Sequence, residues 1–116
     1  MPMIQLTAPS GALTDQGRAE VQRELLHWEG APDTAFFSAQ AWSYLTELPA
    51  QAQTTAEDDL PRFRVDVTVP EGALSDRRRS GLVEEATRIV LQAAGLAASD
   101  APRVWVLIHE QADGTW

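Results

Sequence analysis

The 116-residue sequence contains no cysteine. This absence excludes a disulfide framework, thiolate catalysis and a zinc–thiolate site. The two histidines, His27 and His109, do not have the spacing of a metal-ligand pair. We therefore predict a protein that works without a bound metal ion.

Positive charge is also scarce. Nine basic residues stand against 17 acidic ones, and the formal net charge is −8. Such a chain repels phosphate backbones, so we expect no nucleic-acid partner. No apolar run approaches the length of a membrane span, and the first ten residues lack the basic and apolar regions of a signal peptide. We expect a cytoplasmic protein without membrane contact.

The feature that stands out is a repeated phrase. "TAPSGALTD" at 7–15 returns as "TVPEGALSD" at 68–76, with six of nine positions identical. Apolar residues alternate before each copy, which predicts a strand running into a turn. Thr14 and Ser75 then occupy helix N-cap positions, and apolar residues with helical spacing follow them. Each copy ends in a second predicted strand, at 41–48 and 103–110.

The chain is therefore one domain, 1–116, made of two β-α-β units. We place the units at 2–48 and 62–116 and read 49–61 as a flexible linker, because nothing in that segment is periodic. Strands joined through a helix run parallel. We predict an α+β fold, a four-stranded sheet with both helices on one face. Because the other face also needs cover, we expect an oligomer.

The two units differ at one position that could carry a catalytic group. At the repeat offset, Phe63 is matched by Pro2. Removal of Met1, normal before a small residue, would leave Pro2 as a secondary amine in alternation register with Ile4 and Leu6. Apolar surroundings lower the pKa of an amine from its usual value of about 7.7–8.0, which suits a general base near neutral pH. Pro2 also admits a plain reading as the second residue of an ordinary strand.

The "MP" start, the "LTD" turn and the "VWVLIHE" strand together resemble the tautomerase superfamily. The resemblance covers nearly the whole chain and is to the fused two-unit type, as in malonate semialdehyde decarboxylase and cis-3-chloroacrylic acid dehalogenase. It is more distant to 4-oxalocrotonate tautomerase. It implies a tautomerase/MIF-like fold, a homotrimer, a small carbonyl substrate, and catalysis by Pro2 as an isomerase without a cofactor.

The family's other site positions carry different residues here. The turn before the second helix has no arginine and offers Glu71 instead. Arg103 lies two residues before Trp105, where the single-unit enzyme has an arginine, and would point to the same sheet face. Leu107 takes the place of a strand tyrosine, and Trp116 that of an aromatic pocket residue. We therefore name Glu71, Arg103, Trp105, Leu107 and Trp116 as candidate substrate-binding residues and expect a neutral or differently anchored ketone.

Several alternatives stay open. Arg77–Arg79 form either a solvated face with ion pairs or a clamp for a substrate anion. Glu47 and Glu110 are expected to cap strand ends or pair with arginines. The aromatic strand residues are expected to pack the sheet; they are Trp42, Tyr44 and Trp105. His27 is expected at the surface of a helix end. It lies two residues before Glu29, the position at which the dehalogenase has a histidine.

The sequence also leaves open whether the protein is an enzyme or a non-catalytic binding module. Pro2 could act as a general base in keto–enol tautomerisation, or as a protonated acid in a decarboxylase, hydratase or dehalogenase. The chain could instead be a non-catalytic, ferredoxin-like binding module or a degenerate tautomerase.

Overall fold

A computed structural model describes residues 1–27 and 34–116 of the chain. Trp28, Glu29 and the predicted helix end at 29–33 lie outside the described residues. The elements, in chain order, are β1 (Met3–Pro9), α1 (Asp15–Leu26), α2 (Ala35–Gln40), β2 (Trp42–Leu48), β3 (Phe63–Pro70), α3 (Asp76–Ala93), η1 (Ala98–Arg103) and β4 (Val104–Gln111). The short helices α2 and η1 are not part of the sequence prediction.

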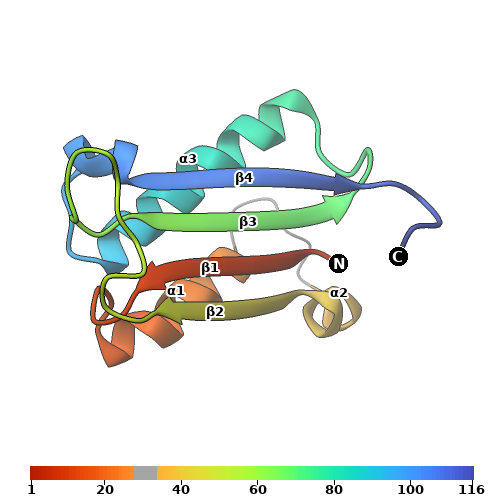
Figure 1. Cartoon of the computed structure of the whole chain (residues 1–116). Helices are drawn as coiled ribbons and strands as arrows, with labels where there is room; N and C mark the ends of the chain where they lie inside the picture. Colours follow the sequence, from red (N-terminus) through yellow and green to blue (C-terminus); the bar gives the residue numbers. More distant parts are fainter. Residues whose placement is uncertain (28–33) are drawn as a thin grey trace.

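The four strands form one sheet in the order β2-β1-β3-β4 (Figure 1). The outer pairs, β1–β2 and β3–β4, are parallel, whereas the central pair β1–β3 is antiparallel. Each parallel pair is one β-α-β unit. The predicted fold class, an α+β sheet with the helices on one face, is confirmed.

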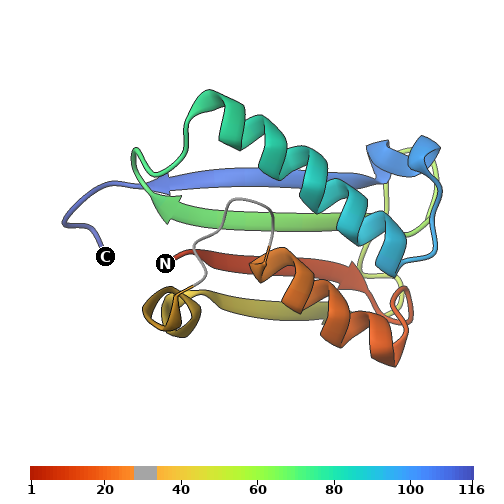
Figure 2. The same cartoon turned by 180° about the vertical axis from the view of Figure 1, so that it is seen from behind.

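The core lies between the sheet and the two long helices, which cover the same face (Figure 2). Alternation decides which side chains enter it: Ile4 and Leu6 of β1 and Val65 and Val67 of β3 are all at most 1% exposed. Leu82 and Ile89 are among the largest fully buried side chains, and both come from α3. The period-two pattern in the sequence therefore placed these residues correctly.

Both units enter their first helix in the same way. The Thr14 hydroxyl accepts a hydrogen bond from the Gly17 N–H at 2.9 Å, and the Ser75 hydroxyl accepts one from the Arg78 N–H at 3.2 Å. The turn before each cap needs a left-handed residue, which is Gly11 at φ +83° and its counterpart Gly72 at φ +80°. The predicted caps are confirmed, and the repeated phrase codes for a repeated turn.

The repeat extends to ion pairs between helix and strand. Arg18 of α1 lies 2.7 Å from Glu47 of β2, and Arg79 of α3 lies 3.1 Å from Glu110 of β4. Asp76 also pairs with Arg79 in the first turn of α3. The prediction that Glu47 and Glu110 pair with arginines is confirmed, and Arg79 of the Arg77–Arg79 run is engaged in ion pairs.

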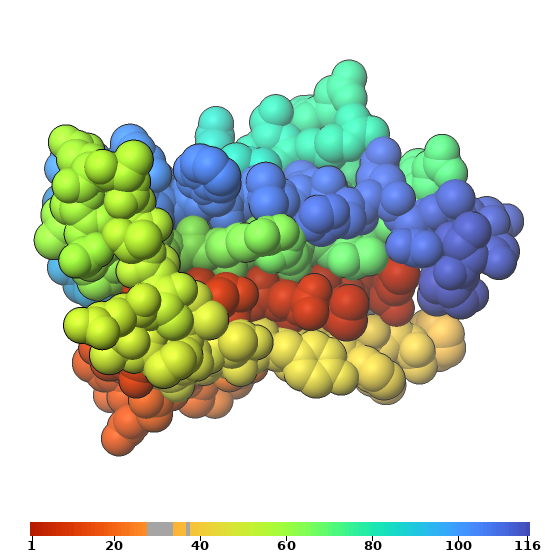
Figure 3. Space-filling view, in the orientation of Figure 1, coloured from red at the N-terminus to blue at the C-terminus, as the bar shows by residue number. Residues whose placement is uncertain are grey.

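The face of the sheet away from the helices is open in the single chain (Figure 3). Trp42, Tyr44 and Trp105 point to this face and are 57%, 52% and 68% exposed. The expectation that they pack the sheet is wrong for one chain, because their register places them opposite the helix layer. Leu107 lies on the same open face and is half-buried.

The predicted linker 49–61 forms an ordered loop with its own hydrogen bonds. The Thr55 N–H donates to the Asp58 carbonyl at 3.0 Å, and the Asp58 carboxylate lies 3.0 Å from the Arg62 guanidinium. The loop stands over one end of the open face, at the left of Figure 3. In the described part of the chain, no helix has the length and apolarity that a membrane crossing requires.

Candidate functional site

Pro2 lies at the start of a central strand. It immediately precedes β1 and is half-buried. Its carbonyl accepts a hydrogen bond from the Trp42 N–H at 3.1 Å, which ties it to the first residue of β2. The indole of Trp42 in turn donates to the Ala39 carbonyl at 3.0 Å. The start of β1 is therefore fixed to the start of β2. The residue that makes this bond, Trp42, carries an exposed indole ring.

Two other candidate residues lie at the same end of the sheet. Glu71 and Trp116 follow the carboxyl ends of β3 and β4, and both chain termini lie at this end in Figure 1. The Glu71 N–H donates to the Gln111 carbonyl at 2.8 Å, and the Glu71 side chain is exposed. Trp116 is 63% exposed. This end thus presents an amine position, a carboxylate and aromatic surface.

The remaining candidates do not join Pro2. Arg103 and Trp105 lie at the opposite end, at the start of β4. At about 3.3 Å per residue, the length of β4 puts roughly 20 Å between the two ends. Leu107 lies between them, across from Asp66 of β3. One chain therefore cannot bring Arg103 or Trp105 to a small molecule bound at Pro2.

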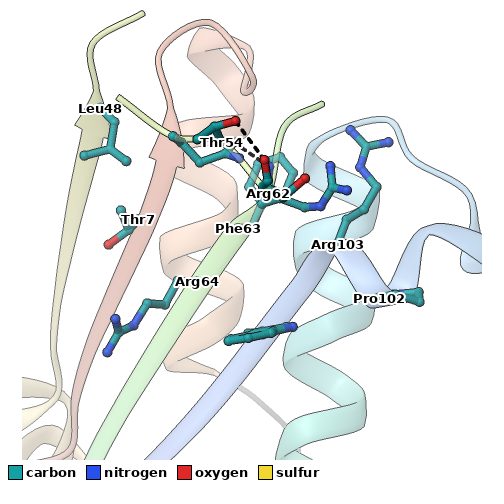
Figure 4. Close-up of a pocket in the computed structure, with 11 residues that line it drawn as sticks. Thr7, Leu48, Thr54, Arg62, Phe63, Arg64, Pro102 and Arg103 are labelled. Atoms are coloured by element: carbon teal, nitrogen blue, oxygen red, sulfur yellow. Dashed lines mark hydrogen bonds between the residues drawn. The ribbon is translucent and has the colours of Figure 1, made fainter. Parts of the chain in front are cut away.

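Arg103 and Trp105 instead line a cavity of about 440 Å³ (Figure 4). The cavity lies between the ends of the strands, the loop 49–61 and η1. Its walls are Thr7, Leu48, Gln53, Thr54, Thr55, Arg62, Phe63, Arg64, Pro102, Arg103 and Trp105. Of these, Arg103 and Trp105 were predicted as binding residues, whereas the loop residues and Arg62 and Arg64 were missed. The missed arginines flank Phe63, the repeat counterpart of Pro2. Their position beside Phe63 is the sequence feature that could have identified them as site residues.

The three arginines of the cavity differ in how firmly they are paired. Arg62 makes two contacts to the Asp58 carboxylate, at 3.0 and 3.4 Å, and these hydrogen bonds hold the pKa of that carboxyl below its usual value. Arg64 binds Asp66 at 2.8 and 3.1 Å. The Arg103 Nε donates to the Pro61 carbonyl at 2.9 Å, but its Nη1 lies 3.5 Å from Asp100. Of the three arginines, Arg103 thus has the longest distance to its carboxylate partner.

A second polar cluster lies in the middle of the open face. The Asp66 side chain is 13% exposed and accepts from Arg64 and from His109, whose Nε2 lies 2.7 Å from Asp66 Oδ1. Burial raises the pKa of the Asp66 carboxyl, but the hydrogen bonds from Arg64 and His109 outweigh burial, and the pKa lies below its usual value. The sequence reasoning missed this cluster because His109 lies on another strand, 43 residues after Asp66 in the chain, and no local pattern pairs the two.

The contacts of His27 settle its position. His27 is exposed and its Nδ1 lies 2.7 Å from the Arg23 carbonyl at the end of α1, so its predicted surface position is confirmed. Among residues 1–27 and 34–116, no group of three or more histidine, aspartate or glutamate side chains could hold a metal ion.

Comparison with known proteins gives the fold a context. No protein-family model matches the chain, and no curated protein sequence does. Solved structures do match. A fused 4-OT that forms a symmetric trimer is 17% identical with a TM-score of 0.81, over 99% of this chain and 89% of that one. Pt0534, solved after inactivation by 2-oxo-3-pentynoate, is 18% identical with a TM-score of 0.81, over 98% and 89%.

A member of the cis-3-chloroacrylic acid dehalogenase family is 21% identical with a TM-score of 0.77, over 96% of this chain and 76% of that one. At these identities the likeness establishes the fold. The resemblance to fused, two-unit tautomerases is thus confirmed at the level of the fold, over nearly the whole chain.

Proposed function

We propose that this chain, which folds as the fused two-unit tautomerases do, is itself a cofactor-independent tautomerase that uses Pro2 as its general base. The observation that carries the proposal is the position of Pro2. It opens a central strand, is half-buried, and is held by the Trp42 N–H. Its repeat counterpart, Phe63, is a core residue 3% exposed, so one unit of the two retains a candidate amine.

The proposed reaction is a keto–enol tautomerisation. Loss of Met1 frees the Pro2 nitrogen as a secondary amine, and partial burial favours its neutral form. The neutral amine takes a proton from the carbon next to a carbonyl group, and the protonated amine returns it at another position of the enol. A base of this kind contributes about 100-fold to 10,000-fold in rate when its pKa lies near the working pH.

The substrate is proposed to be a small carbonyl compound that contacts Glu71 and Trp116 at the Pro2 end. The turn 69–75 contains no arginine, so a neutral or differently anchored ketone fits this end better than a dicarboxylate. Leu107, Arg103 and Trp105 can act on the same substrate only if a second chain supplies them, because roughly 20 Å of β4 separates the ends.

A homotrimer in the cytoplasm completes the proposal. The fused 4-OT matches form trimers, and the open sheet face of this chain carries exposed Trp42, Tyr44 and Trp105. Exposed aromatic surface of this kind is typical of protein–protein interfaces. Native mass spectrometry of the untagged protein should give three times the chain mass of 12.7 kDa.

The decisive experiment uses untagged protein and compares Pro2→Ala with Pro9→Ala. Pro9 ends the same strand, so its replacement is a matched control for the loss of a proline. Mass spectrometry should show that Met1 is absent. Enol formation from a panel of ketones, followed by ultraviolet absorbance, should fall about 100-fold or more in Pro2→Ala and remain near wild type in Pro9→Ala.

Activity that survives Pro2→Ala would refute the mechanism, as would retention of Met1. A ¹⁵N NMR titration separates the variants of the mechanism. A Pro2 pKa near neutral supports the base, whereas an amine still protonated well above neutral pH would contradict it and favour decarboxylation or hydration.

A further inference from the structure

The second unit places an ion pair at the Pro2 end of the sheet. The central strands β1 and β3 are antiparallel, so the carboxyl end of β3 lies beside the amino end of β1. Figure 2 shows α3 beginning at the end of the sheet where both chain termini lie. Arg79, in the first turn of α3, and Glu110, near the end of β4, meet there at 3.1 Å.

The strand register brings Glu110 into the same row as Pro2. Met3 is paired with Thr68 in the antiparallel ladder. One residue further along, Pro2 stands opposite Val69, and Val69 is paired with Glu110. Two strand spacings of about 4.8 Å therefore separate Pro2 from Glu110, which is roughly 10 Å between their Cα atoms.

Pro2 and the ion pair also share a face of the sheet. Pro2 is in alternation with Ile4, which is buried beneath the helices, and Arg79 reaches Glu110 from the helix layer. Val69, which lies between Pro2 and Glu110, is 6% exposed. Charges that act across apolar side chains are screened much less than charges separated by water. An amine at Pro2 should therefore respond to the charge of this pair.

The other charged groups toward this end are better hydrated or lie on the other face. The Arg79 and Glu110 side chains are 37% and 33% exposed, whereas the Asp76 side chain is 99% exposed. Asp66 and His109 lie on the open face and bind each other. The remaining charged groups toward this end within residues 1–27 and 34–116 are all exposed; they are Arg23, Glu24, His27, Glu71, Arg77, Arg78 and Asp113.

We propose that the Arg79–Glu110 ion pair sets the basicity of the Pro2 amine, so that the second unit controls the base carried by the first. Arg79 neutralises a carboxylate that would otherwise stabilise the protonated form of the amine. The inference rests on the proposed function, because it requires Pro2 to be a free amine. Arg79 and Glu110 act through Pro2 and are positioning residues.

The test is a ¹⁵N NMR titration of Pro2 in untagged, proline-labelled protein at about 0.1 M salt. Arg79→Gln leaves the Glu110 carboxylate without its cation and should raise the Pro2 pKa by about 0.5–1, the size expected for one charge roughly 10 Å away. Glu110→Gln removes the carboxylate and should lower the Pro2 pKa by a similar amount. Arg79→Lys keeps the positive charge and should titrate as the wild type does.

The repeat supplies a matched control at the far end of the sheet. Arg18 and Glu47 form the same kind of helix-to-strand ion pair, at 2.7 Å and with comparable exposure. Glu47 is paired with Ala8, six residues after Pro2 and therefore about 20 Å away. Arg18→Gln should lower the urea midpoint of unfolding about as much as Arg79→Gln does, but it should leave the Pro2 pKa unchanged.

Three results would overturn the inference: an unchanged Pro2 pKa in Arg79→Gln and Glu110→Gln, shifts of the same sign in these two variants, or an equal shift in Arg18→Gln. The titration needs no substrate, which separates the inference from the proposed function. If Pro2→Ala keeps its activity while the expected shifts appear, the proposed function fails and the electrostatic control stands. Loss of activity in Pro2→Ala without a shift in Arg79→Gln would overturn the control alone. Retention of Met1 would overturn both, because Pro2 would then carry no free amine.

Discussion

The Asp66 carboxylate is the best place to test the electrostatics of the open sheet face. Its side chain is 13% exposed and accepts hydrogen bonds from Arg64 at 2.8 and 3.1 Å and from His109 at 2.7 Å. Asp66→Asn keeps the shape and removes the charge. The two partners stay half-hydrated, at 58% and 49% exposed, so the cost falls well short of that of a fully buried pair. We expect the free energy of unfolding at pH 7 to fall by about 1–2 kcal/mol.

The dependence on pH follows from the direction of the pKa shift. The pKa of Asp66 is lower in the folded chain than its ordinary value. The stability that its charge contributes is therefore complete above the unfolded pKa, about 3.9, and disappears as pH falls through the folded pKa. The difference between the wild type and Asp66→Asn should shrink as the pH is lowered from 7 toward 3.

Urea denaturation at fixed protein concentration measures both quantities, because concentration matters for any oligomer. Asp113→Asn, at an exposed position after β4, is the control and should change the free energy of unfolding by less than about 0.5 kcal/mol. A loss that is the same at pH 7 and pH 3 would show that the Asp66 charge is not the cause. A loss no larger than the control's would show that the cluster is not stabilising.

Two further predictions concern the packing of the repeat units. Gly81 lies inside α3 with nothing within 4 Å of an added methyl group, whereas Gly72 sits in a left-handed turn at φ +80°. In thermal denaturation Gly81→Ala should stabilise by about 0.5–1 kcal/mol and Gly72→Ala should destabilise by about 1–2 kcal/mol; equal effects would contradict the turn geometry. Leu82→Ala, which empties a site 1% exposed, should cost about 2–5 kcal/mol, and Val83→Ala, 37% exposed on the same helix, should cost less than about 1 kcal/mol. Similar losses for the two would place Leu82 outside the core.

Much of the fold could be predicted from the sequence because the signals are local. The alternation around Val65 and Val67 sets which residues face the helices, and the caps Thr14 and Ser75 set where the helices begin. The repeated phrase shows that one unit is present twice. Two parallel β-α-β units then leave few ways to form one sheet. Pro2 was named from its repeat counterpart, and the structure places it at the start of a central strand.

The exposed aromatics show where such reasoning ends. Trp42 and Trp105 are apolar residues in strands, and periodicity assigns them a face without saying what covers it. Neither of the two long helices packs over that face, because both lie on the other one, and these two tryptophans are 57% and 68% exposed. The exposure of these side chains thus depends on which face of the sheet the helices cover, and the strand sequence does not determine that.

By itself, the sequence determined the two units, their strands and caps, the placement of the core, and the contrast between Pro2 and Phe63. Only the tertiary structure decided that the candidate residues divide between the two ends of the sheet, because strand direction, and not distance along the chain, sets which end a residue reaches. It also decided that the segment 49–61, which has no periodicity, folds over Phe63 and Trp105 to make a cavity. Contacts between a loop, a short helix and four strands depend on residues far apart in the chain, and no local pattern encodes them.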